Sequence, residues 1–431
     1  MRHDLLHLWF LADPYAPRCV GALRLVDPGK GASLQYGADW LEHGFALSED
    51  LPLTDIEQLP RWKGMAVGAV DDARPDRWGE RVIQYIDRPA RLSIMEYLFY
   101  AGDDRFGALG VSTSAVAYIP CAQSPLPRLE QAQLLSEIVH KVSAKEPVSD
   151  IERKMLSAGG SLGGTKPKAL IEIAGEQWII KFFNNEPIDV PLIEHASMTL
   201  AALARIDVAE TRVLPLAGEN ALAVRRYDRN GVMRVHCISA GTALRAETVA
   251  GQEPEFGYPN LAQLLRRAGV ADDDLNLHDM HELFRRMVFN ILIDNTDDHE
   301  KNHALRVVMP TRQGRYRLAP AYDVLPTNSG QGYQEFSVGA DGRNSTLANA
   351  MSQCRLFGYT PAQAAAEVVR VIAVVNGWRA HFAACGVTHA DLESLAERID
   401  GAVLLGQRRS FDPTNYALPP RSPRRRSPFA R

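Results

Sequence analysis

Apolar residues in the N-terminal part of the chain occur in short runs that favour strands. The runs at residues 5–12, 22–26 and 107–112 have the length and composition of β-strands, and stretches with helical spacing separate them. The first run contains His7, follows a single Arg and precedes an Asp-Pro pair without a small-residue cleavage site, so it is interpreted as a first strand and not as a secretory signal. The pattern predicts a separate α+β module.

A second region begins after a segment rich in Pro, Ala and Gln at residues 120–129, which is typical of a linker. A helical stretch is predicted at about 131–157. Two β-rich runs then occupy residues 169–173 and 178–183, and the residues 174–177 between them predict a hairpin with a four-residue loop.

From about residue 191 apolar residues recur at three- and four-residue steps, which predicts helix. A strand-like run follows at 221–224, and most of the chain beyond 257 has a helical pattern. Residues 281–293 form a predicted helix whose buried face carries Leu283, Phe284, Met287, Val288, Ile291 and Leu292. This helix leads directly into a polar loop.

Two further elements are predicted towards the C-terminus. Thr360 and Gln363 form a capping box with a proline at the first helical position, which predicts a helix that Gly377 can close. The last segment, around 421–428, is rich in Pro and Arg and has no core pattern, so a disordered tail is expected.

Composition narrows the class of protein. The 431 residues are 46% hydrophobic and 23% charged, enough for about three ordinary domains or two larger lobes. A net charge of -4 provides no general basic field for nucleic acid. No apolar run reaches the roughly 18 residues that a membrane span requires. The five cysteines are scattered and never in CxxC spacing, which favours a reducing cytoplasm over a disulfide framework.

A glycine-rich loop covers residues 159–168 and reads Gly-Gly-Ser-Leu-Gly-Gly-Thr-Lys-Pro-Lys. Glycines allow the backbone N–H groups to approach phosphate oxygens, and Lys166 or Lys168 can add positive charge. The loop departs from the Walker pattern because Thr165, not a lysine, follows Gly164. It opens the predicted hairpin, and this position favours a phosphate-binding role over that of a plain flexible turn.

Lys181 lies in the apolar second strand of that hairpin, where its charge is costly unless it is paired. A ligand phosphate and the carboxylate of Glu194 on the next helix can pair with it. The alternative is a lysine that extends to solvent from an edge strand.

The nine residues from Asn295 to His303 allow two readings. Phosphoryl transfer requires a carboxylate to orient the attacking hydroxyl and further oxygen ligands for Mg²⁺. Asp297, Asn302 and Asp323 can provide these groups, and the Asp-x4-Asn spacing matches the catalytic loop of protein kinases. The hairpin predicted at 304–308 and 315–318 returns the chain, so that Asp297 and Asp323 can share one site.

The other reading is a zinc peptidase, because residues 299–303 also spell His-Glu-x-x-His. It requires His299 and His303 on one helical turn with Glu300 as the base, and Asp323 can act as a third ligand. The preceding Asn-Thr-Asp-Asp is turn chemistry, and the five residues have no apolar stripe. This reading also leaves the glycine-rich loop and Lys181 unexplained. Of the remaining loop side chains, Asp298 is interpreted as a solvated carboxylate and His299 as a loop-stabilising histidine.

Taken together, these motifs resemble the HipA family of serine/threonine kinases, toxins of type II toxin–antitoxin pairs, over roughly residues 15 to 400. The matching N-terminal segments are 20–25, 46–53, 72–78 and 102–109. The matching segments of the kinase core are 161–169, 179–181, 223–229, 295–303 and 320–323.

The resemblance implies a two-lobed, protein-kinase-like α+β fold with an appended N-terminal α+β module and a mainly helical C-terminal lobe. The implied divisions are a module at 1–118, a connection at 119–150, an ATP-binding lobe at 151–232, a helical catalytic lobe at 233–410 and an Arg/Pro-rich tail at 411–431.

The resemblance also implies roles for particular residues. Asp297 and Asn302 are expected to be catalytic, Asn302 and Asp323 to bind Mg²⁺, and Ser161 to be a regulatory autophosphorylation site. The residues expected to bind ATP are Gly163, Gly164, Thr165, Lys166, Lys168, Lys181, Glu194, Arg225 and Tyr227, of which Arg225 and Tyr227 lie at the hinge that holds adenine.

The expected activity is ATP- and Mg²⁺-dependent phosphorylation of a protein serine or threonine, with a translation component such as an aminoacyl-tRNA synthetase as the substrate implied by the resemblance. The implied partner is a HipB-like DNA-binding antitoxin, so contact with DNA is expected only through that partner, in the cytoplasm and without a membrane. The alternatives are a small-molecule kinase on the same fold, an inactive kinase-like co-repressor, and the zinc peptidase.

Overall fold

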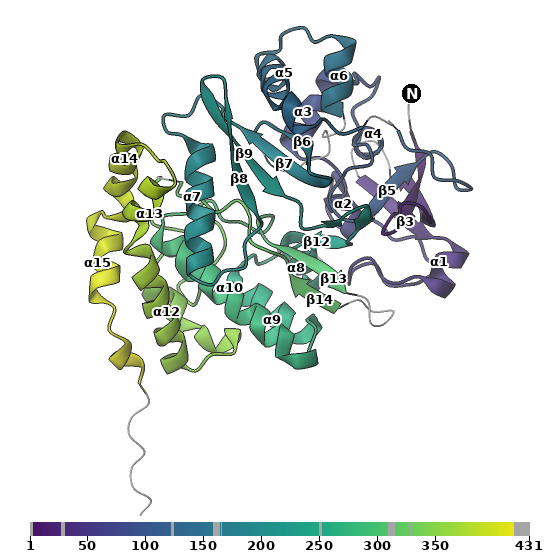
Figure 1. Ribbon diagram of the computed structural model, residues 1–431. Coiled ribbons are helices and arrows are strands. Elements are labelled where there is room, and N and C mark those ends of the chain that lie inside the picture. Colours follow the sequence, from purple (N-terminus) through teal and green to yellow (C-terminus); the bar gives the residue numbers. More distant parts are fainter. Residues whose placement is uncertain are drawn as a thin grey trace, which may run out of the picture.

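The computed structural model describes residues 3–26, 31–121, 125–157, 164, 166–249, 252–308, 315–327 and 329–417. The N-terminal module lies on one side of the molecule and the last helices lie on the opposite side, with the remaining sheets and helices between them (Figure 1). Among the described residues, no helix combines the length and apolar character needed to cross a membrane.

The N-terminal module is built on a five-stranded sheet with the order β4-β3-β2-β1-β5, antiparallel except for the β3–β4 pair. Its strands are β1 (Leu5–Phe10), β2 (Arg18–Leu25), β3 (Gly31–Tyr36), β4 (Met65–Ala66) and β5 (Leu109–Ser112). Its helices are α1 (Ala38–His43), α2 (Ala69–Asp72), α3 (Arg77–Ile86) and α4 (Ile94–Tyr100). The strands predicted at the three short apolar runs are therefore confirmed.

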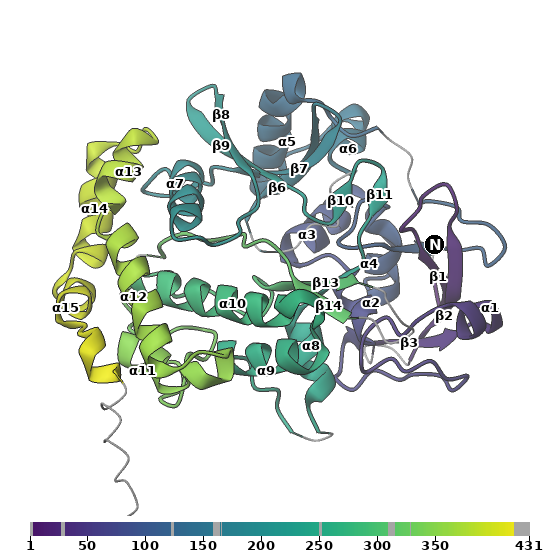
Figure 2. The same cartoon turned by 60° about the horizontal axis from the view of Figure 1, so that its bottom comes forward.

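The central lobe contains a four-stranded antiparallel sheet with the order β6-β7-β9-β8. The strands are β6 (Lys168–Ile173), β7 (Glu176–Phe182), β8 (Thr211–Leu216) and β9 (Glu219–Arg225). Helix α7 (Val190–Leu203) runs beside this sheet (Figures 1 and 2). Helix α5 (Ala132–Ala144), with α6 (Asp150–Ser157) next to it, packs against the face of β6, β7 and β9.

Two local predictions in this lobe need correction. The hairpin between β6 and β7 has a two-residue turn, Ala174 and Gly175, not a four-residue loop. Both turn residues have positive φ, as a tight hairpin turn requires, and Glu176 and Gln177 already pair with β6. The helical stretch predicted at about 131–157 is interrupted and forms two helices, because Lys145 takes the left-handed conformation that ends α5.

The helical lobe surrounds α10 (Leu275–Leu292), with α9 (Tyr258–Ala268) beside it (Figure 2). All six apolar residues predicted on the buried face of α10 are fully buried. The other helices of this lobe are α8 (Ala240–Glu247), α11 (Leu347–Ser352), α12 (Pro361–Val375), α13 (Trp378–Ala384), α14 (His389–Ile399) and α15 (Ala402–Ser410). The capping box formed by Thr360 and Gln363 opens α12 as predicted. The helix ends at Val375, and Gly377 directly follows its C-cap residue and precedes α13.

A small sheet with the order β12-β13-β14 lies beside α10. It consists of β12 (Cys237–Ser239), β13 (Ala304–Val308) and β14 (Arg315–Leu318), so the hairpin predicted after the polar loop is confirmed at its exact bounds. A two-stranded ribbon, β10 (Arg229–Asn230) with β11 (Met233–Arg234), precedes it.

The short 3-10 helices are η1 (Leu129–Gln131), η2 (Asp272–Asp274), η3 (Cys354–Phe357) and η4 (Pro413–Tyr416). In η4 Tyr416 stacks on Phe411, and both rings pack against the main core. The predicted start of the tail at residue 411 is therefore too early. Residues 418–431, with the Arg-rich run, lie outside the described residues.

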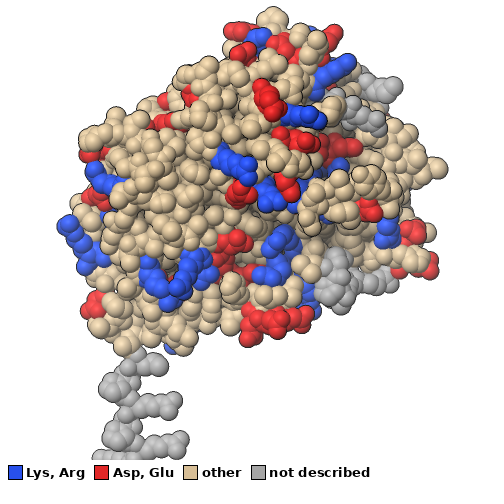
Figure 3. Space-filling model, viewed as in Figure 1, with Lys and Arg blue, Asp and Glu red and all other residues tan. Residues whose placement is uncertain are grey.

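The buried apolar side chains form two clusters, and α3 belongs to the smaller one. The larger cluster joins the module sheet, α7 and the helical lobe. The smaller contains Trp78, Val82 and Ile86 of α3 together with α5 and the inner face of β6, β7 and β9. A helix of the N-terminal module thus forms part of the core beneath the central sheet. On the surface, acidic and basic side chains are intermingled on the face shown in Figure 3.

Candidate active site

Lys181 is the centre of the best-defined polar site. It lies on β7 opposite Lys168 of β6, and its side chain is only 14% exposed. Its Nζ donates to Glu194 Oε1 on α7 at 2.5 Å and to Asp323 Oδ1 at 2.7 Å. Burial alone would lower the pKa of Lys181, but the Asp323 and Glu194 carboxylates raise it above its ordinary value, so the ammonium stays charged. The predicted pairing of Lys181 with Glu194 is confirmed.

Asp323 reaches this site from the segment after β14, which returns the chain towards the polar loop. Its backbone has a φ of 60°, a left-handed conformation that costs a non-glycine residue about 1 kcal/mol. Although partial burial acts to raise the pKa of the carboxyl, Lys181 and Lys168 lower it well below its usual range. The side chain is 42% exposed, so a carboxylate faces solvent beside the buried lysine.

The described part of the glycine-rich loop lies at the same end of the sheet. Gly164 has a φ of 91°, a conformation that residues with a side chain rarely adopt, and a Cβ at this position would lie 2.5 Å from Lys168 Nζ. Lys168 is buried; that burial and the charge of Lys181 lower its pKa to about 8. Lys166 is more exposed and pairs with Glu186 at 3.5 Å. The predicted residues Ser161, Gly163 and Thr165 lie outside the described residues.

The two predicted hinge residues have different surroundings. The guanidinium of Arg225 turns to Glu176 at 3.1 Å and Glu210 at 3.6 Å near the end of β9. Tyr227 stacks on Tyr322, with ring centroids 5.4 Å apart, and Tyr322 directly precedes Asp323 in the chain. Tyr227 therefore lies beside the Lys181–Asp323 site, whereas the Arg225 side chain is engaged with surface carboxylates.

Beyond the hinge, the chain is fastened to the N-terminal module by a buried ion cluster that the sequence did not indicate. Arg226 binds Asp228 at 2.8 and 2.9 Å and donates to the carbonyls of Asp104 and Arg105. Asp228 also accepts the Gly107 N–H at 2.8 Å. These contacts hold the segment after β9 against the module loop at 104–107.

The polar loop that follows α10 presents Asp297 to solvent while its neighbours are buried. Partial burial raises the pKa of Asp297; His299 acts against this with a smaller lowering, and the nearby Asp323 carboxylate adds a further, smaller raising. Asn302 is buried, and its amide nitrogen makes a long 3.4 Å contact with the Asp297 carbonyl. Among the described residues, no hydrogen bond to its amide oxygen is found. The loop thus exposes one carboxylate and holds one amide near it.

A buried network beneath the loop sets its shape. Asp298 Oδ2 accepts from His303 Nε2 at 2.8 Å and from the Tyr258 hydroxyl. Asn290 on α10 donates to that hydroxyl and accepts from the Asn295 amide. The interpretation of Asp298 as a solvated carboxylate is therefore wrong, because it is 2% exposed. His299 Nδ1 accepts the Lys301 N–H within the loop, as a loop-stabilising histidine does.

The same network argues against a zinc site. His303 Nε2 is occupied by Asp298, and its ring packs between Tyr258 and Phe336 in the core. Residues 299–303 are a turn and not a helical ladder. Within the ranges that the structure describes, no group of three or more His, Cys, Asp or Glu residues is arranged to hold a metal. The His-Glu-x-x-His string is an accident of sequence.

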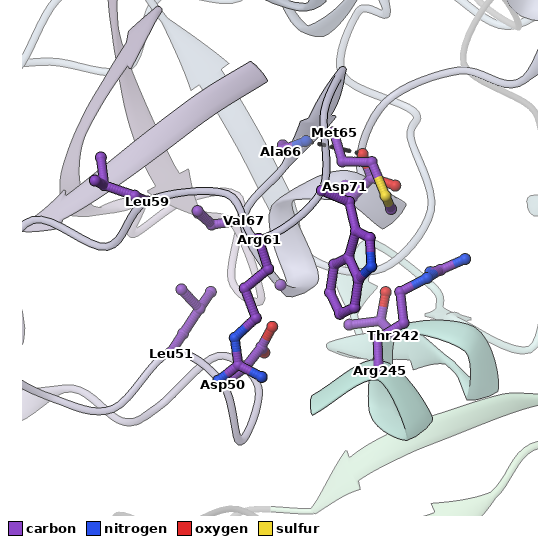
Figure 4. Close-up of a pocket in the computed structure, with 12 residues that line it drawn as sticks. Asp50, Leu51, Leu59, Arg61, Met65, Ala66, Val67, Asp71, Thr242 and Arg245 are labelled. Carbon is purple, nitrogen blue, oxygen red and sulfur yellow. Dashed lines mark hydrogen bonds between the residues drawn. The ribbon is translucent and has the colours of Figure 1, made fainter. Parts of the chain in front are cut away.

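A separate pocket lies between the N-terminal module and α8 (Figure 4), and Lys181 is not among the residues that line it. Asp71 and Arg61 line it from the module, and Thr242 and Arg245 line it from α8. Asp71 is held by the Ala66 N–H at 3.0 Å. Arg245 lies 3.7 Å from Glu300 of the polar loop, so one wall of this pocket touches that loop.

Comparison with solved structures shows the class of fold. The chain matches a chain of the Shewanella oneidensis MR-1 complex of the toxin–antitoxin proteins HipA and HipB with operator DNA, with a TM-score of 0.66 and 17% identity. The match covers 94% of this chain and 97% of that one. The predicted fold is confirmed: a two-lobed, kinase-like α+β architecture with an N-terminal module and a mainly helical C-terminal lobe.

Comparison of sequences then shows the family. Residues 160–378 match the HipA-like C-terminal domain, and residues 15–112 match the HipA N-terminal domain. The chain belongs to the HipA family.

Curated relatives match over shorter segments. The candidate kinase Y4dM of Sinorhizobium fredii is 33% identical over 36% of this chain and 39% of its own length. A candidate kinase of Haemophilus influenzae is 25% identical over 39% of this chain and 52% of its own length. The chain thus spans about two fifths to half of these relatives.

Proposed function

We propose that this protein is an ATP- and Mg²⁺-dependent kinase that phosphorylates serine or threonine in a protein substrate. The observation that carries the proposal is the position of Lys181, paired with Glu194 and Asp323 at the end of the glycine-rich loop. A buried lysine with two carboxylates at a glycine-rich loop is the arrangement that kinases use to orient nucleotide phosphates. Membership of the HipA family and the relatives named as candidate kinases support it.

In this proposal Lys181 binds the nucleotide phosphates, and Glu194 keeps the lysine in position. Gly163, Gly164 and Thr165 form the loop around the proposed phosphate site, and the charges of Lys166 and Lys168 add to it. Tyr227 and the backbone at Arg225 lie at the adenine end.

Asp297 is the proposed base. Its exposed carboxylate accepts the proton of the substrate hydroxyl while the oxygen forms a bond to the γ-phosphorus and ADP departs. The raised pKa of Asp297 suits this role, because a more basic carboxylate takes the proton more readily.

Asn302 and Asp323 are the proposed magnesium ligands. Mg²⁺ prefers oxygen ligands and uses one or two protein groups in addition to phosphate oxygens. An amide oxygen and a carboxylate kept ionised by Lys181 and Lys168 fit that preference. When bound, the ion would offset negative charge on the phosphates.

Ser161 is proposed as a site of regulatory autophosphorylation. A phosphate there would add about −1.5 to −2 charge to a loop that binds another anion, so the modified loop should leave the nucleotide site.

The proposed biological role is that of a toxin which acts in the cytoplasm on a translation component, such as an aminoacyl-tRNA synthetase, and which a HipB-like antitoxin holds inactive. The solved relative was found with HipB and operator DNA. By this analogy the present chain meets DNA only through its partner.

Two other functions predict different products. A small-molecule kinase on the same fold would consume ATP without forming a phosphoprotein. An inactive co-repressor would not bind Mg·ATP at all. The presence of Lys181, Asp297, Asn302 and Asp323 in this chain disfavours that function.

The test uses the purified chain with γ-labelled ATP, Mg²⁺ and a cell extract. We expect label in one or a few extract proteins, and at least a hundredfold less with Asp297→Ala. The control is Asp294→Asn, three residues earlier, which should keep most of the activity. Equal labelling by wild type and Asp297→Ala would overturn the assignment of the base, and ATP loss without a labelled protein would favour the small-molecule kinase.

A further inference from the structure

Asp76 of the N-terminal module connects two loops that are far apart in the sequence. Its Oδ2 accepts the N–H of Gly164 at 3.0 Å, and its Oδ1 accepts from Lys301 Nζ at 2.5 Å. Gly164 belongs to the glycine-rich loop, and Lys301 belongs to the loop that carries Asp297 and Asn302. One carboxylate therefore contacts both halves of the candidate site.

The Asp76 carboxylate binds these two loops instead of capping its own helix. Asp76 is the N-cap residue of α3, where an aspartate usually accepts an N–H from the first turn of its own helix. Its side chain makes no such capping bond. The carboxylate instead extends to the two loops.

Both partners of Asp76 are held by further contacts. Trp78, two residues on, donates its backbone N–H to the Gly164 carbonyl at 3.2 Å and its indole N–H to the Lys168 carbonyl at 2.8 Å. The indole is 1% exposed in the core beneath β6. The Lys301 carbonyl accepts the Tyr322 hydroxyl at 2.6 Å. The distance between the loops is thus set by anchored groups on both sides.

The charges also require an explanation. A carboxylate beside a proposed phosphate site repels the phosphates, so an acid here needs a compensating partner. Although burial acts to raise the pKa of Asp76, Lys301 lowers it overall, and the two form an ion pair. The side chain of Asp76 is 23% exposed and that of Lys301 is 38% exposed, so the pair is partly screened by solvent. The ion pair therefore contributes more to the relative position of the two loops than to the stability of the protein.

We propose that Asp76 is a positioning residue that fixes the glycine-rich loop relative to the Asp297 loop, so that the N-terminal module takes part in aligning the two halves of the active site. This inference rests on the proposed phosphotransfer function. Misplacing reacting groups by about 1 Å can cost on the order of a hundredfold in rate. Loss of Asp76 should therefore lower kcat more than it raises the KM for ATP.

The kinetic test compares Asp76→Ala, Asp76→Asn and Asp76→Glu with the wild type. We expect kcat to fall about tenfold or more in Asp76→Ala and Asp76→Asn, with KM for ATP changed less than threefold, and Asp76→Glu to recover part of kcat. The matched control is Glu80→Gln on the same helix. Glu80 is similarly exposed but pairs with Arg74 at 3.3 Å, and its loss should change kcat less than twofold.

A double-variant comparison separates positioning from a general loss of fold. In a Lys301→Met background, Asp76→Ala should lower kcat by a clearly smaller factor than in the wild type, because one of its two partners is already gone. Equal factors in both backgrounds, an unchanged kcat in Asp76→Ala, or an equal loss in Glu80→Gln would overturn the proposal.

Hydrogen exchange tests the same contact without activity. Peptides that contain Gly164 and Lys301 should both exchange several times faster in Asp76→Ala, and peptides from α12 should not change. If the wild type fails to transfer phosphate but this exchange pattern is seen, the proposed kinase function is wrong. The structural coupling of the two loops through Asp76 is then still supported. Unchanged exchange at both peptides overturns the coupling, even in an active kinase.

Discussion

Asp298 and His303 lie five residues apart in one loop and connect its two ends, with His303 Nε2 2.8 Å from Asp298 Oδ2. Both side chains are buried. Although burial acts to raise the pKa of Asp298, the nearby His303 lowers it overall. The preceding residue, Asp297, is exposed. Two adjacent aspartates therefore have opposite environments.

Asp298→Ala is predicted to destabilise the protein by about 3 kcal/mol, because it leaves the buried His303 and the Tyr258 hydroxyl without their shared acceptor. Urea unfolding followed by circular dichroism measures this loss. Asp297→Ala serves as the control and should change the free energy of unfolding by less than about 0.5 kcal/mol. Similar losses in the two variants would contradict the network described here.

Lys181→Met is predicted to weaken binding of Mg·ATP at least tenfold. The substitution keeps the length of the side chain but removes the charge between Glu194 and Asp323, which would leave those two carboxylates to repel phosphate. Calorimetric titration with a non-hydrolysable ATP analogue measures the affinity. Lys141→Met, which breaks an exposed pair with Glu152, should bind like the wild type. Unchanged affinity in Lys181→Met would remove Lys181 from the nucleotide site.

Ser161→Ala is predicted to keep substrate phosphorylation and to lose self-inactivation. In the wild type, preincubation with Mg·ATP should lower later activity as a phosphopeptide containing Ser161 accumulates; the variant should stay active and lack that peptide. Mass spectrometry and a time course of activity give both readings. Identical phosphopeptide maps for the two proteins would show that Ser161 is not the modified residue.

Features with a local signature could be predicted from the sequence. The hairpin of β13 and β14, the buried face of α10 and the capping box at Thr360 depend on residues a few positions apart. The pairing of Lys181 with Glu194 was also predictable, because the next helix along the chain packs beside its strand.

Features that depend on distant contacts could not be predicted. The Asp76–Lys301 pair joins residues 225 positions apart, and an aspartate before a helix looks like an ordinary N-cap. Asp298 appears in a run of polar turn residues, and only Tyr258, 40 positions earlier, reveals that it is buried. The four-residue loop predicted at Ala174 is wrong for a local reason: Glu176 and Gln177 are polar like loop residues, although they pair within the sheet.

His236 makes the contact between the N-terminal module and the helical lobe sensitive to acid. It is 3% exposed, contacts the Leu47 carbonyl through Nε2 at 3.0 Å, and packs against Phe10 and Phe45. Burial lowers its pKa from 6.5 to about 4, against a smaller raising by the Leu47 carbonyl. The unfolded chain therefore binds a proton at His236 between pH 6.5 and 4 that the folded protein does not.

Stability should accordingly fall as the pH drops through this window, and the part due to His236 should reach about 2 kcal/mol at pH 5 relative to pH 7.5. His236→Gln keeps a donor for Leu47 but does not titrate, so its loss of unfolding free energy over the same interval should be smaller by about that amount. His389→Gln, at a position where the side chain is 88% exposed, should behave like the wild type. Urea unfolding at the two pH values measures all three proteins. An equal loss in His236→Gln and the wild type would mean that His236 is not the acid-sensitive group, because the other titrating side chains are common to both.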